Sequence, residues 1–439
     1  MANKTYSQRF QEYLVAVADP DNLQKLCKLE FLNDDDTVAY VLDNRYKKRY
    51  SGGHDSRAFL QDGTLNVSLQ NGQRRKASIT LENLDGAFDY AIGKLWFGQR
   101  VRLSMGCRLS DGYEFYLPQG IFYLDSPQNS WKPNGRKATY SLVDKWARLD
   151  GTILGKLKDS YTVNINENIF DAMLAILHRS IYTQKATNIE AEMFDSQTPL
   201  FTDIFNSRFV TVEGKAYPMC LTPEKLTVEQ GGTCADMLLK LNSVVAGWIG
   251  YDASGALNVM PSENDTLDQT KPIQWEFTPY SKTFLGLTEK AQIGQVYNHV
   301  TIVGESLSEI EGTQPYGIAV NNDPSSDTSI QNIGLRSYIE NDDNYHTDEQ
   351  CRGLAAFRLK RMTALQKSVT IESTQLFHLQ ENNLVTVLRA DKPHSPIERH
   401  LIQSFSLPLA ENKSMTITAT SVADFPAIEY EEVQRTTEN

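Results

Sequence analysis

Between residues 28 and 149 the chain alternates apolar and polar side chains in short runs, and this period of two restricts what the segment can form. The runs are rich in β-branched and aromatic residues. Clusters such as Asn71-Gly72 and Asp111-Gly112 separate them and tolerate the positive φ of tight hairpins. The runs are KLEFL, TVAYVL, TLNVSLQ, KASITLEN, QRVRLSM, YEFYL, GIFYLDS and ATYSLVD. Strands at near-regular spacing, with no helical pattern between them, predict an antiparallel barrel or sandwich.

Helical spacing occurs first near the N-terminus, where Phe10, Tyr13, Leu14 and Val17 recur at intervals of three and four. This spacing predicts a short amphipathic helix from Thr5 to about Val17 that docks on the rest of the molecule and carries no site of its own.

The middle third, from about Asn164 to Ala246, again has helical periodicity. Asn166 is a predicted N-cap for one helix, and Thr233 with Asp236 predicts a capping pair for another. A hairpin is expected next, over residues 247–259. This part of the chain reads as a small α+β unit, divided into two subdomains.

The β pattern resumes after Pro279, and one strong helix interrupts it. Thr347 and Gln350 predict a capping box in front of that helix. The last residues, from about Glu429, are polar and acidic and predict a frayed tail. The expected strands are residues 298–303, 316–320, 368–372, 384–388, 400–407 and 415–420.

These patterns predict an α+β chain dominated by β-structure, with two β-barrel domains flanking a smaller insert. The predicted divisions are an N-terminal helix or arm (1–27), a first barrel (28–155), an α+β insert (156–280), a second barrel with one helix (281–428) and an acidic tail (429–439). No tandem repeat is visible, but two β-rich ends around an insert suggest an ancient duplication.

Composition excludes several classes of protein. Lys+Arg 43 against Asp+Glu 55 leaves a net charge of −12, which disfavours a grip on phosphate backbones or anionic membranes. We find no secretory signal and no membrane-length apolar stretch, so no membrane anchoring is expected. The cysteines lack CxxC spacing and predict reduced, mostly buried thiols without a cysteine metal site; they are Cys27, Cys107, Cys220, Cys234 and Cys351.

Motifs that carry chemistry are absent from the sequence. It has no phosphate-binding loop, dinucleotide fingerprint, nucleophile elbow or HExxH pair. His394 and His400 are expected to be ordinary surface histidines, and residues 33–36 and 321–327 to be polar loops, not calcium loops. Residues 73–76 and 156–158 are interpreted as rim charges. We therefore predict no catalytic residue, no cofactor-binding residue, no cofactor and no metal ligand.

Three stretches, taken in order, resemble the hub proteins of phage tail baseplates and tail tips. The first has a strand ending in Asn83-Leu84-Asp85-Gly86, then residues 98–103 and 120–126. The second is residues 233–259. The third runs from residues 296–304 through the predicted helix to Leu379–Val387. Asn382-Asn383 departs from the Gly-Asp that is common in the family. The resemblance spans residues 28–425.

The resemblance implies a structural protein of the virion tail in a phage or a phage-derived contractile particle. Such hubs are homotrimers in which two barrels per chain form a ring of six. The ring adapts a six-fold tail tube or distal tail protein ring to a three-fold tip or spike. It also implies contact with a tape measure protein, transient non-specific DNA passage through a lumen, and assembly in the cytoplasm of a bacterial host.

Two other functions stay open. A receptor- or carbohydrate-binding tail protein would use exposed aromatic residues, for which Trp96, Trp131 and Trp248 are candidates. A tail-associated cell-wall hydrolase would need two converging carboxylates, and the sequence does not single out a pair among its acidic residues.

Overall fold

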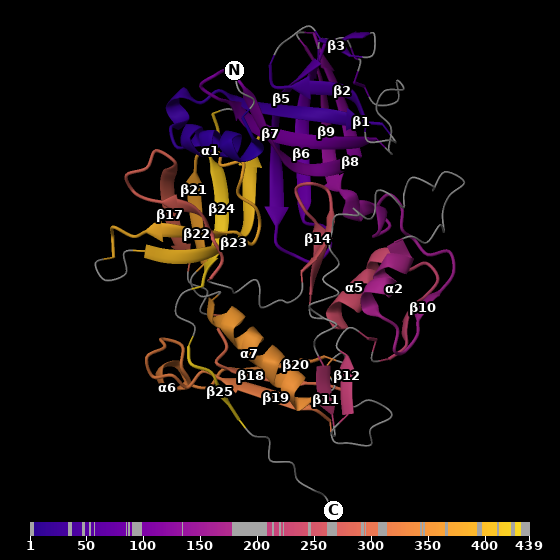
Figure 1. The fold of residues 1–439 in the computed structure, drawn as a ribbon, viewed down its shortest axis with the longest axis vertical. Helices are drawn as coiled ribbons and strands as arrows, with labels where there is room; N and C mark the ends of the chain where they lie inside the picture. Colours follow the sequence, from indigo (N-terminus) through magenta and orange to yellow (C-terminus); the bar gives the residue numbers. More distant parts are fainter. Residues whose placement is uncertain are drawn as a thin grey trace, which may run out of the picture.

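The computed structural model describes residues 4–33, 37–45, 49–51, 54–56, 58–84, 86, 88–89, 99–133, 135–177, 209–212, 215–218, 221–222, 224–244, 247–260, 270–290, 294, 296–305, 314–342, 345, 347–364, 368–392, 397–410, 412–422 and 426–431. Figure 1 shows β-structure in the upper part of the molecule, a helical unit beside it and a second, smaller sheet below.

Thirteen strands form one large sheet. They are β1 (Lys25–Leu32), β2 (Val38–Asp43), β5 (Ala58–Ser68), β6 (Arg75–Asn83), β7 (Arg100–Arg108), β8 (Glu114–Lys132), β9 (Gly135–Asp144), β16 (Ile273–Phe277), β17 (Phe284–Lys290), β21 (Ser368–Ser373), β22 (Leu384–Leu388), β23 (Ile397–Pro408) and β24 (Met415–Ser421). Their order is β17-β21-β24-β23-β5-β6-β9-β8-β7-β1-β2, and β22 pairs with both β23 and β16. The β16–β22 pair is parallel. The other pairs are antiparallel.

The first β region comprises β1, β2 and β5–β9, and it follows the alternation in the sequence. On β6, Ala77, Ile79 and Leu81 are buried while Lys76 and Ser78 are exposed. Strands β2 and β5 are the first and last strands in the order of this region, and they lie close to each other. The predicted antiparallel β-structure is confirmed, and its closure into a barrel stays a prediction.

The runs YEFYL and GIFYLDS were predicted as two strands, and this is wrong: they are parts of the single strand β8. Pro118 and Gln119 lie between the two runs. The register with β7 shifts here, because Leu103 pairs with Gly120 and Ser104 pairs with Pro118, which leaves Gln119 as the extra residue of a bulge. Gly120 has a φ of 143°, which explains why the segment looks like a turn in the sequence.

The second β region comprises β16, β17 and β21–β24, and it continues the first region in the same sheet. Strand β23 pairs with β5 from Ser404↔Ser68 to Pro408↔Thr64. A single hydrophobic core includes Val67 of the first region and Phe405 of the second. Strand β16 lies on the insert side of the predicted boundary at residue 280, yet it pairs with β22.

The insert packs around its own core. It contains the helices α2 (Ile169–Leu177) and α5 (Cys234–Val244). Its antiparallel strand pairs are β10 (Tyr161–Val163) with β13 (Leu226–Val228), and the hairpins β11 (Phe209–Val212) with β12 (Lys215–Pro218) and β14 (Trp248–Tyr251) with β15 (Leu257–Met260). The Thr233–Asp236 capping pair is confirmed: the Thr233 N–H donates to Asp236 Oδ2 at 2.8 Å, and the Asp236 N–H donates to Thr233 Oγ1 at 3.1 Å. The predicted N-cap Asn166 is wrong, because Asn168 accepts the bonds from the start of α2 and Asn166 has a φ of 62°.

A separate four-stranded sheet lies within the predicted 281–428 domain. Its order is β20 (Ser337–Asn341), β18 (His299–Val303), β19 (Tyr316–Val320) and β25 (Glu429–Tyr430), with α6 (Ile330–Ile333) nearby and α7 (Asp348–Ala364) packed on it. Thr347 accepts a bond from the Gln350 N–H, as a cap should. A Cβ at Gly317 would lie 2.1 Å from the Cys351 backbone, so α7 packs directly on β19. Glu429–Tyr430 pair with β19, so the chain is not yet frayed at 429 as predicted.

Helix α1 (Tyr6–Val17) lies where the two β regions meet (Figure 1). Thr5 and Gln8 form a capping box at its N-terminus. Tyr13 is fully buried, and its ring lies 5.5 Å from Phe115 of β8 and 6.4 Å from Phe377, which precedes β22. The predicted docking helix therefore contacts both β regions.

We expect Tyr13→Ala to lower the free energy of unfolding by about 3 to 5 kcal/mol, because it removes a buried aromatic ring from a filled core. Val15→Ala is the matched control, since Val15 is 75% exposed on the same helix. Urea unfolding followed by tryptophan fluorescence measures both variants. Equal midpoints for the two would contradict the role of α1 in joining the regions.

Candidate functional site at the junction of the β regions

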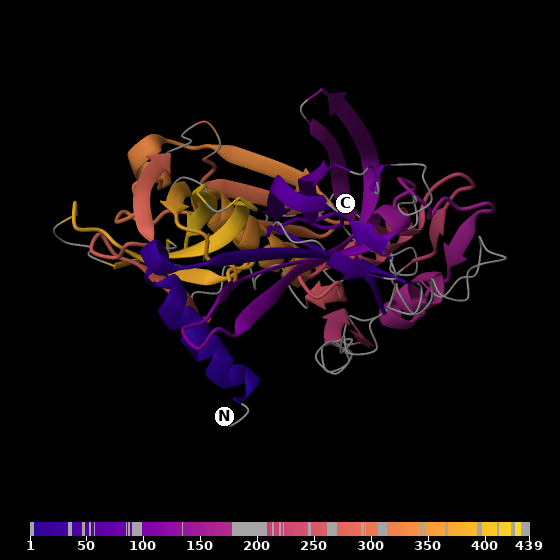
Figure 2. The ribbon, with the colours of Figure 1, turned by 90° about the horizontal axis from the view of Figure 1, so that it is seen from above.

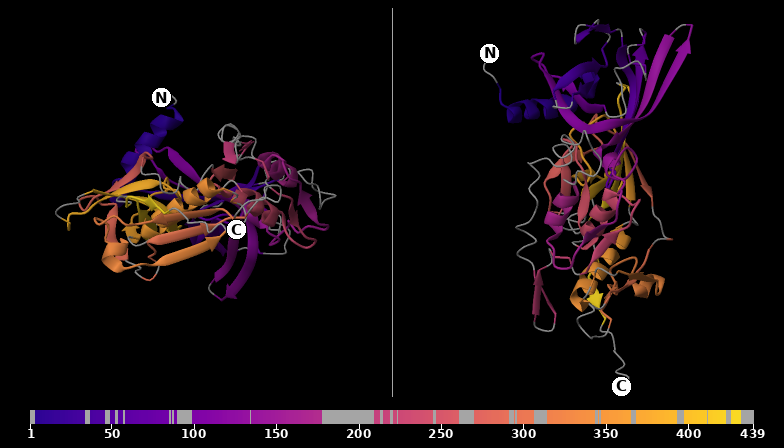
Figure 3. Two further views of the ribbon diagram at one scale, coloured as in Figure 1. Left: turned by 90° about the horizontal axis from the view of Figure 1, so that it is seen from below. Right: turned by 90° about the vertical axis from the view of Figure 1, so that its right-hand side faces the viewer.

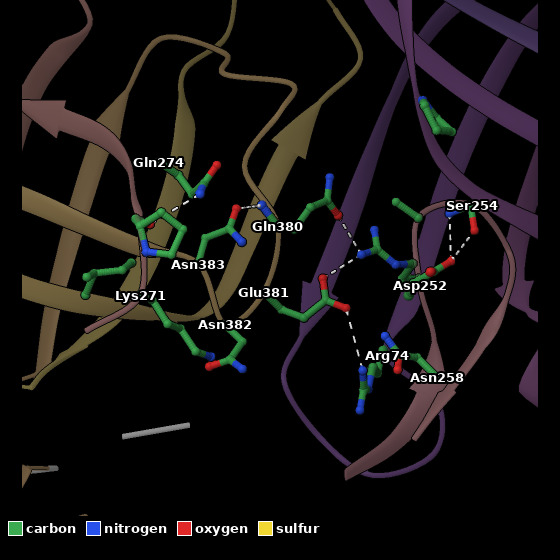
Figure 4. Close-up of a pocket in the computed structure, with 15 residues that line it drawn as sticks. Arg74, Asp252, Ser254, Asn258, Lys271, Gln274, Gln380, Glu381, Asn382 and Asn383 are labelled. Carbon is green, nitrogen blue, oxygen red and sulfur yellow. Dashed lines mark hydrogen bonds and ion pairs between the residues drawn. The ribbon is translucent and has the colours of Figure 1, made fainter. Parts of the chain in front are cut away.

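A cavity of about 530 Å³ lies where the first β region, the second β region and the insert meet (Figure 4). Arg74 and Arg75, at the start of β6, line it from the first region. Asp252 lines it from the β14–β15 hairpin, and residues 380–383 from the loop before β22. The junction thus brings together charged groups that are far apart in the sequence.

Arg75 connects the two β regions through buried bonds. Its side chain is 1% exposed and forms an ion pair with Glu381 of the second region. Its Nη2 also donates to Gln380 Oε1 at 2.6 Å, and its Nη1 donates to the Gln119 carbonyl at 3.2 Å. Both charges are desolvated, so Arg75 depends on Glu381 for compensation, and Glu381 is also 3.9 Å from Arg74 Nη1.

Asp144, at the end of β9, organises the same turn from inside the first region. Its Oδ2 accepts the backbone N–H groups of Arg74 and Arg75 at 2.9 and 2.8 Å, and its Oδ1 accepts that of Trp146 at 3.1 Å. Burial raises the pKa of the Asp144 carboxyl to about 6 in spite of these bonds. Burial also lowers the pKa of Arg74, whose Nε donates to the Gln70 carbonyl.

The loop before β22 contains the Asn382-Asn383 pair that departs from the family pattern. Asn382 has a φ of 63°, a left-handed conformation that Gly adopts freely and Asn tolerates. Asn383 Oδ1 accepts the Gln380 N–H at 2.9 Å, a bond that an aspartate oxygen could also accept. The two asparagines therefore support the same kind of turn as Gly-Asp.

The β14–β15 hairpin of the insert docks on the first region by backbone contacts. The Gly72 N–H donates to the Ile249 carbonyl, and the Ile249 N–H donates to Asn71 Oδ1, both at 2.9 Å. A Cβ at Gly250 would lie 2.3 Å from Arg74 Nε, so only glycine leaves room for the arginine. Asp252, in the hairpin turn, accepts bonds from Ser254 and Ala256.

An aromatic cluster on the α1 side of the junction contains His378. The Tyr13 hydroxyl lies 3.2 Å from His378 Nδ1, and the His378 ring packs at 5.3 Å against Trp275 of β16. Burial lowers the pKa of His378 to about 4. The imidazole is therefore neutral at pH 7, and its Nδ1 can accept a hydrogen bond from the Tyr13 hydroxyl.

Residues 73–76 were interpreted as rim charges, and this is wrong for Arg74 and Arg75, which are 4% and 1% exposed. A signal was present: Arg75 shares the period-two face of β6 with Ala77 and Ile79, which are buried. The predicted surface position of His400 is also wrong, because this side chain is 1% exposed. His394 lies outside the described residues.

The remaining residues named from the sequence lie in different environments. Asn321, which is buried, donates to Ser326 and Thr328, so the loop 321–327 is held by its own side chains. Asp34–Asp36, Trp96 and Cys220 lie outside the described residues. Trp131 is 75% exposed and Trp248 is 5% exposed. The remaining cysteines are free and buried; they are Cys27, Cys107, Cys234 and Cys351.

Within the described ranges, no cluster of three or more His, Cys, Asp or Glu side chains is arranged to hold a metal ion. The same ranges contain no helix that is long and apolar enough to cross a membrane. The carboxylates of Glu381 and Asp252 face the cavity, but each accepts bonds that hold the fold together. The junction is built of structural bonds.

Two solved phage tail proteins share this fold. The tail protein from Neisseria meningitidis MC58 superposes with a TM-score of 0.56 at 10% identity, covering 90% of this chain and 96% of its own. The 43 kDa tail protein of prophage MuSo2 from Shewanella oneidensis superposes with a TM-score of 0.55 at 13% identity, covering 90% of this chain and 98% of its own. No protein-family profile and no curated protein matches the sequence. The chain has the fold of phage tail proteins.

We expect acid to weaken the α1 side of the junction through His378. Its pKa is about 4 in the folded chain and about 6.5 in the unfolded chain, so the unfolded state takes up the proton first as the pH falls. Stability that is present above pH 6.5 is lost as the pH approaches 4, by about 3 kcal/mol. The raised pKa of Asp144 stabilises the folded chain as the pH falls through part of the same range, so the contribution of His378 is measured as the difference between wild type and His378→Gln in urea unfolding at several pH values. His378→Gln, which cannot titrate, is the control; an unchanged pH profile in that variant would disprove the assignment.

We expect Glu381→Gln to destabilise the chain by about 3 to 5 kcal/mol, because Arg75 then loses its buried counter-ion. The control is Glu372→Gln on β21, whose carboxylate is exposed. Thermal unfolding of the two variants measures the difference. If both variants melt together with the wild type, the Arg75–Glu381 pair does not hold the junction.

Proposed function

We propose that this chain is a structural protein of a phage or phage-derived tail, and that it acts as the trimeric hub of the baseplate or tail tip. In this role it joins a six-fold tail tube, or a distal tail protein ring, to a three-fold tip or spike. The observation that carries the proposal is a fold shared with two phage tail proteins over 90% of this chain.

The continuous sheet supports the hub role. The first and second β regions stand side by side and are joined by the β5–β23 ladder, so one chain offers two β units to a ring. Three chains would then offer six units to a six-fold tube. The domain divisions at residues 28–155, 156–280 and 281–428, with two barrels, belong to this proposal.

The charge and the chemistry of the chain agree with a passive channel protein. A net charge of −12 would keep DNA from adhering to a lumen during transient passage. The charged groups of the junction form ion pairs and hydrogen bonds that hold the fold together, which supports a role without catalytic turnover. We place the protein in the virion tail, assembled in the cytoplasm of a bacterial host, in contact with tip, tube and tape measure proteins.

We expect the purified chain to form a particle of three times the chain mass of 49.5 kDa. Multi-angle light scattering measures the mass, and negative-stain electron microscopy shows the symmetry. A ring with three-fold symmetry and six similar lobes supports the hub. A monomer at every concentration, with and without candidate tube proteins from the same particle, would overturn it.

A further inference from the structure

The two β regions have the same strand topology. In the first region the strands pair in the order β1-β7-β8-β9-β6-β5, and in the second in the order β16-β22-β23-β24-β21-β17. Taken along the chain, β1, β5, β6, β7, β8 and β9 correspond to β16, β17, β21, β22, β23 and β24. The first region adds β2, and its β1–β7 pair is antiparallel where β16–β22 is parallel. The duplication that the sequence only suggests is visible as topology.

The ladder that joins the two regions is formed by β23 of the second region and β5 of the first. Strand β23 pairs with β22 as far as Leu401, shifts register with β24 after Ile402, and then pairs with β5 from Ser404 onward. Its counterpart β8 pairs with β7 as far as Tyr123 and shifts register with β9 after Leu124. The two strands therefore follow the same course up to the point where β23 meets β5.

Beyond Leu124, one edge of β8 pairs with no strand of the described residues. Within the described residues, Pro127–Lys132 of β8 pair only with β9. Figures 2 and 3 show this β8–β9 hairpin projecting from the body of the molecule. Residues 128–132 are exposed, and Trp131 is 75% exposed. An unpaired strand edge is a ready template for another strand.

Strand β17, the counterpart of β5, has the complementary edge. It pairs with β21 on one side and ends the large sheet on the other, within the described part of the chain. Leu285 is 55% exposed, and Thr288–Lys290 are exposed. In Figure 1, β17 and β8 lie on opposite sides of the molecule, so one chain cannot join them.

We propose that β17 of one chain pairs antiparallel with the distal part of β8 of a second copy, and so repeats the β5–β23 ladder between molecules. This inference rests on the proposed hub and specifies its subunit contact. The occupant is a second copy because the chain already contains the same pairing between the corresponding elements. The contact is head-to-tail, so it either closes into a ring or grows into a filament.

Correspondence also gives the register. Ile79 pairs with Tyr140 in the first region, as Ile371 pairs with Ile417 in the second. Pro127 faces Tyr140 as Phe405 faces Ile417, so Pro127 corresponds to Phe405. Three residues further along each strand, Ser130 corresponds to Pro408.

The same comparison on the other side of the sheet aligns β17 with β5. Gly63 faces Ile79 as Leu287 faces Ile371, so the next residues, Thr64 and Thr288, also correspond. Because Pro408 faces Thr64, Ser130 should face Thr288 of the next copy.

A disulfide between Ser130→Cys and Thr288→Cys tests this register. Directly opposed residues of an antiparallel pair have Cα atoms about 4.5 to 5.5 Å apart, within the range that a disulfide spans. The described native cysteines are buried. After mild oxidation we expect a covalent trimer as the largest species on a non-reducing gel, and a single chain after reduction.

Two variants control the experiment. Asn129→Cys with Thr288→Cys shifts the register by one residue and places the thiols on opposite faces, so it should cross-link at least tenfold less. Ser406→Cys with Asn66→Cys tests the intramolecular pair and should form a disulfide within one chain, detected by peptide mass.

The outcomes separate this inference from the hub proposal. A particle that is trimeric by light scattering but does not cross-link through residues 130 and 288 overturns the β17–β8 contact and leaves the hub standing. Equal cross-linking of the shifted pair also overturns it. A covalent ladder beyond three chains overturns closure as a ring. A monomer without cross-links overturns both proposals.

Discussion

The ladder between β5 and β23 is the interaction on which the rest of the molecule depends. It makes one sheet of two regions that lie far apart in the sequence, and it places Leu65 and Leu407 opposite each other in one core. Because side chains alternate with a period of two, a slip of one strand by one residue would turn its leucine out of the core while the other stayed inside. The register of this ladder therefore determines how the regions face each other, and with that the shape of the junction beside it.

The buried charges of the junction depend on that register. Arg75 comes from one region and Glu381 from the other, so their pairing is possible only when the regions are correctly placed. A desolvated ion pair adds little net stability compared with an apolar pair of similar volume, whereas a separated one is strongly unfavourable. We infer that the pair mainly selects one arrangement of the two regions, and that its contribution to stability is secondary.

Local features of the fold could be predicted from the sequence, and distant ones could not. The alternation on β6 and the Thr233–Asp236 cap each depend only on residues that are close together in the sequence. The β5–β23 pairing has no local signature, because any strand edge can in principle pair with any other. The bulge at Gln119 looks like a turn in the sequence for a different reason: the Gly120 that follows it has a positive φ, which is typical of turns as well as bulges. At the site, the burial of Arg75 was visible in the alternation, but its partner Glu381 was not.

The length of β8 is difficult to explain within a single chain. Its 19 residues extend past the end of β7, and the part beyond Leu124 buries little against its own molecule. An isolated two-stranded ribbon is marginal in water, and an open edge invites aggregation unless it is blunted or covered. Pro127 is a mild safeguard, because proline donates no backbone hydrogen bond, but residues 128–132 keep their donors and acceptors. An arm of this kind is consistent with a strand that is completed by another copy, since pairing satisfies its backbone and closure of the ring limits its growth.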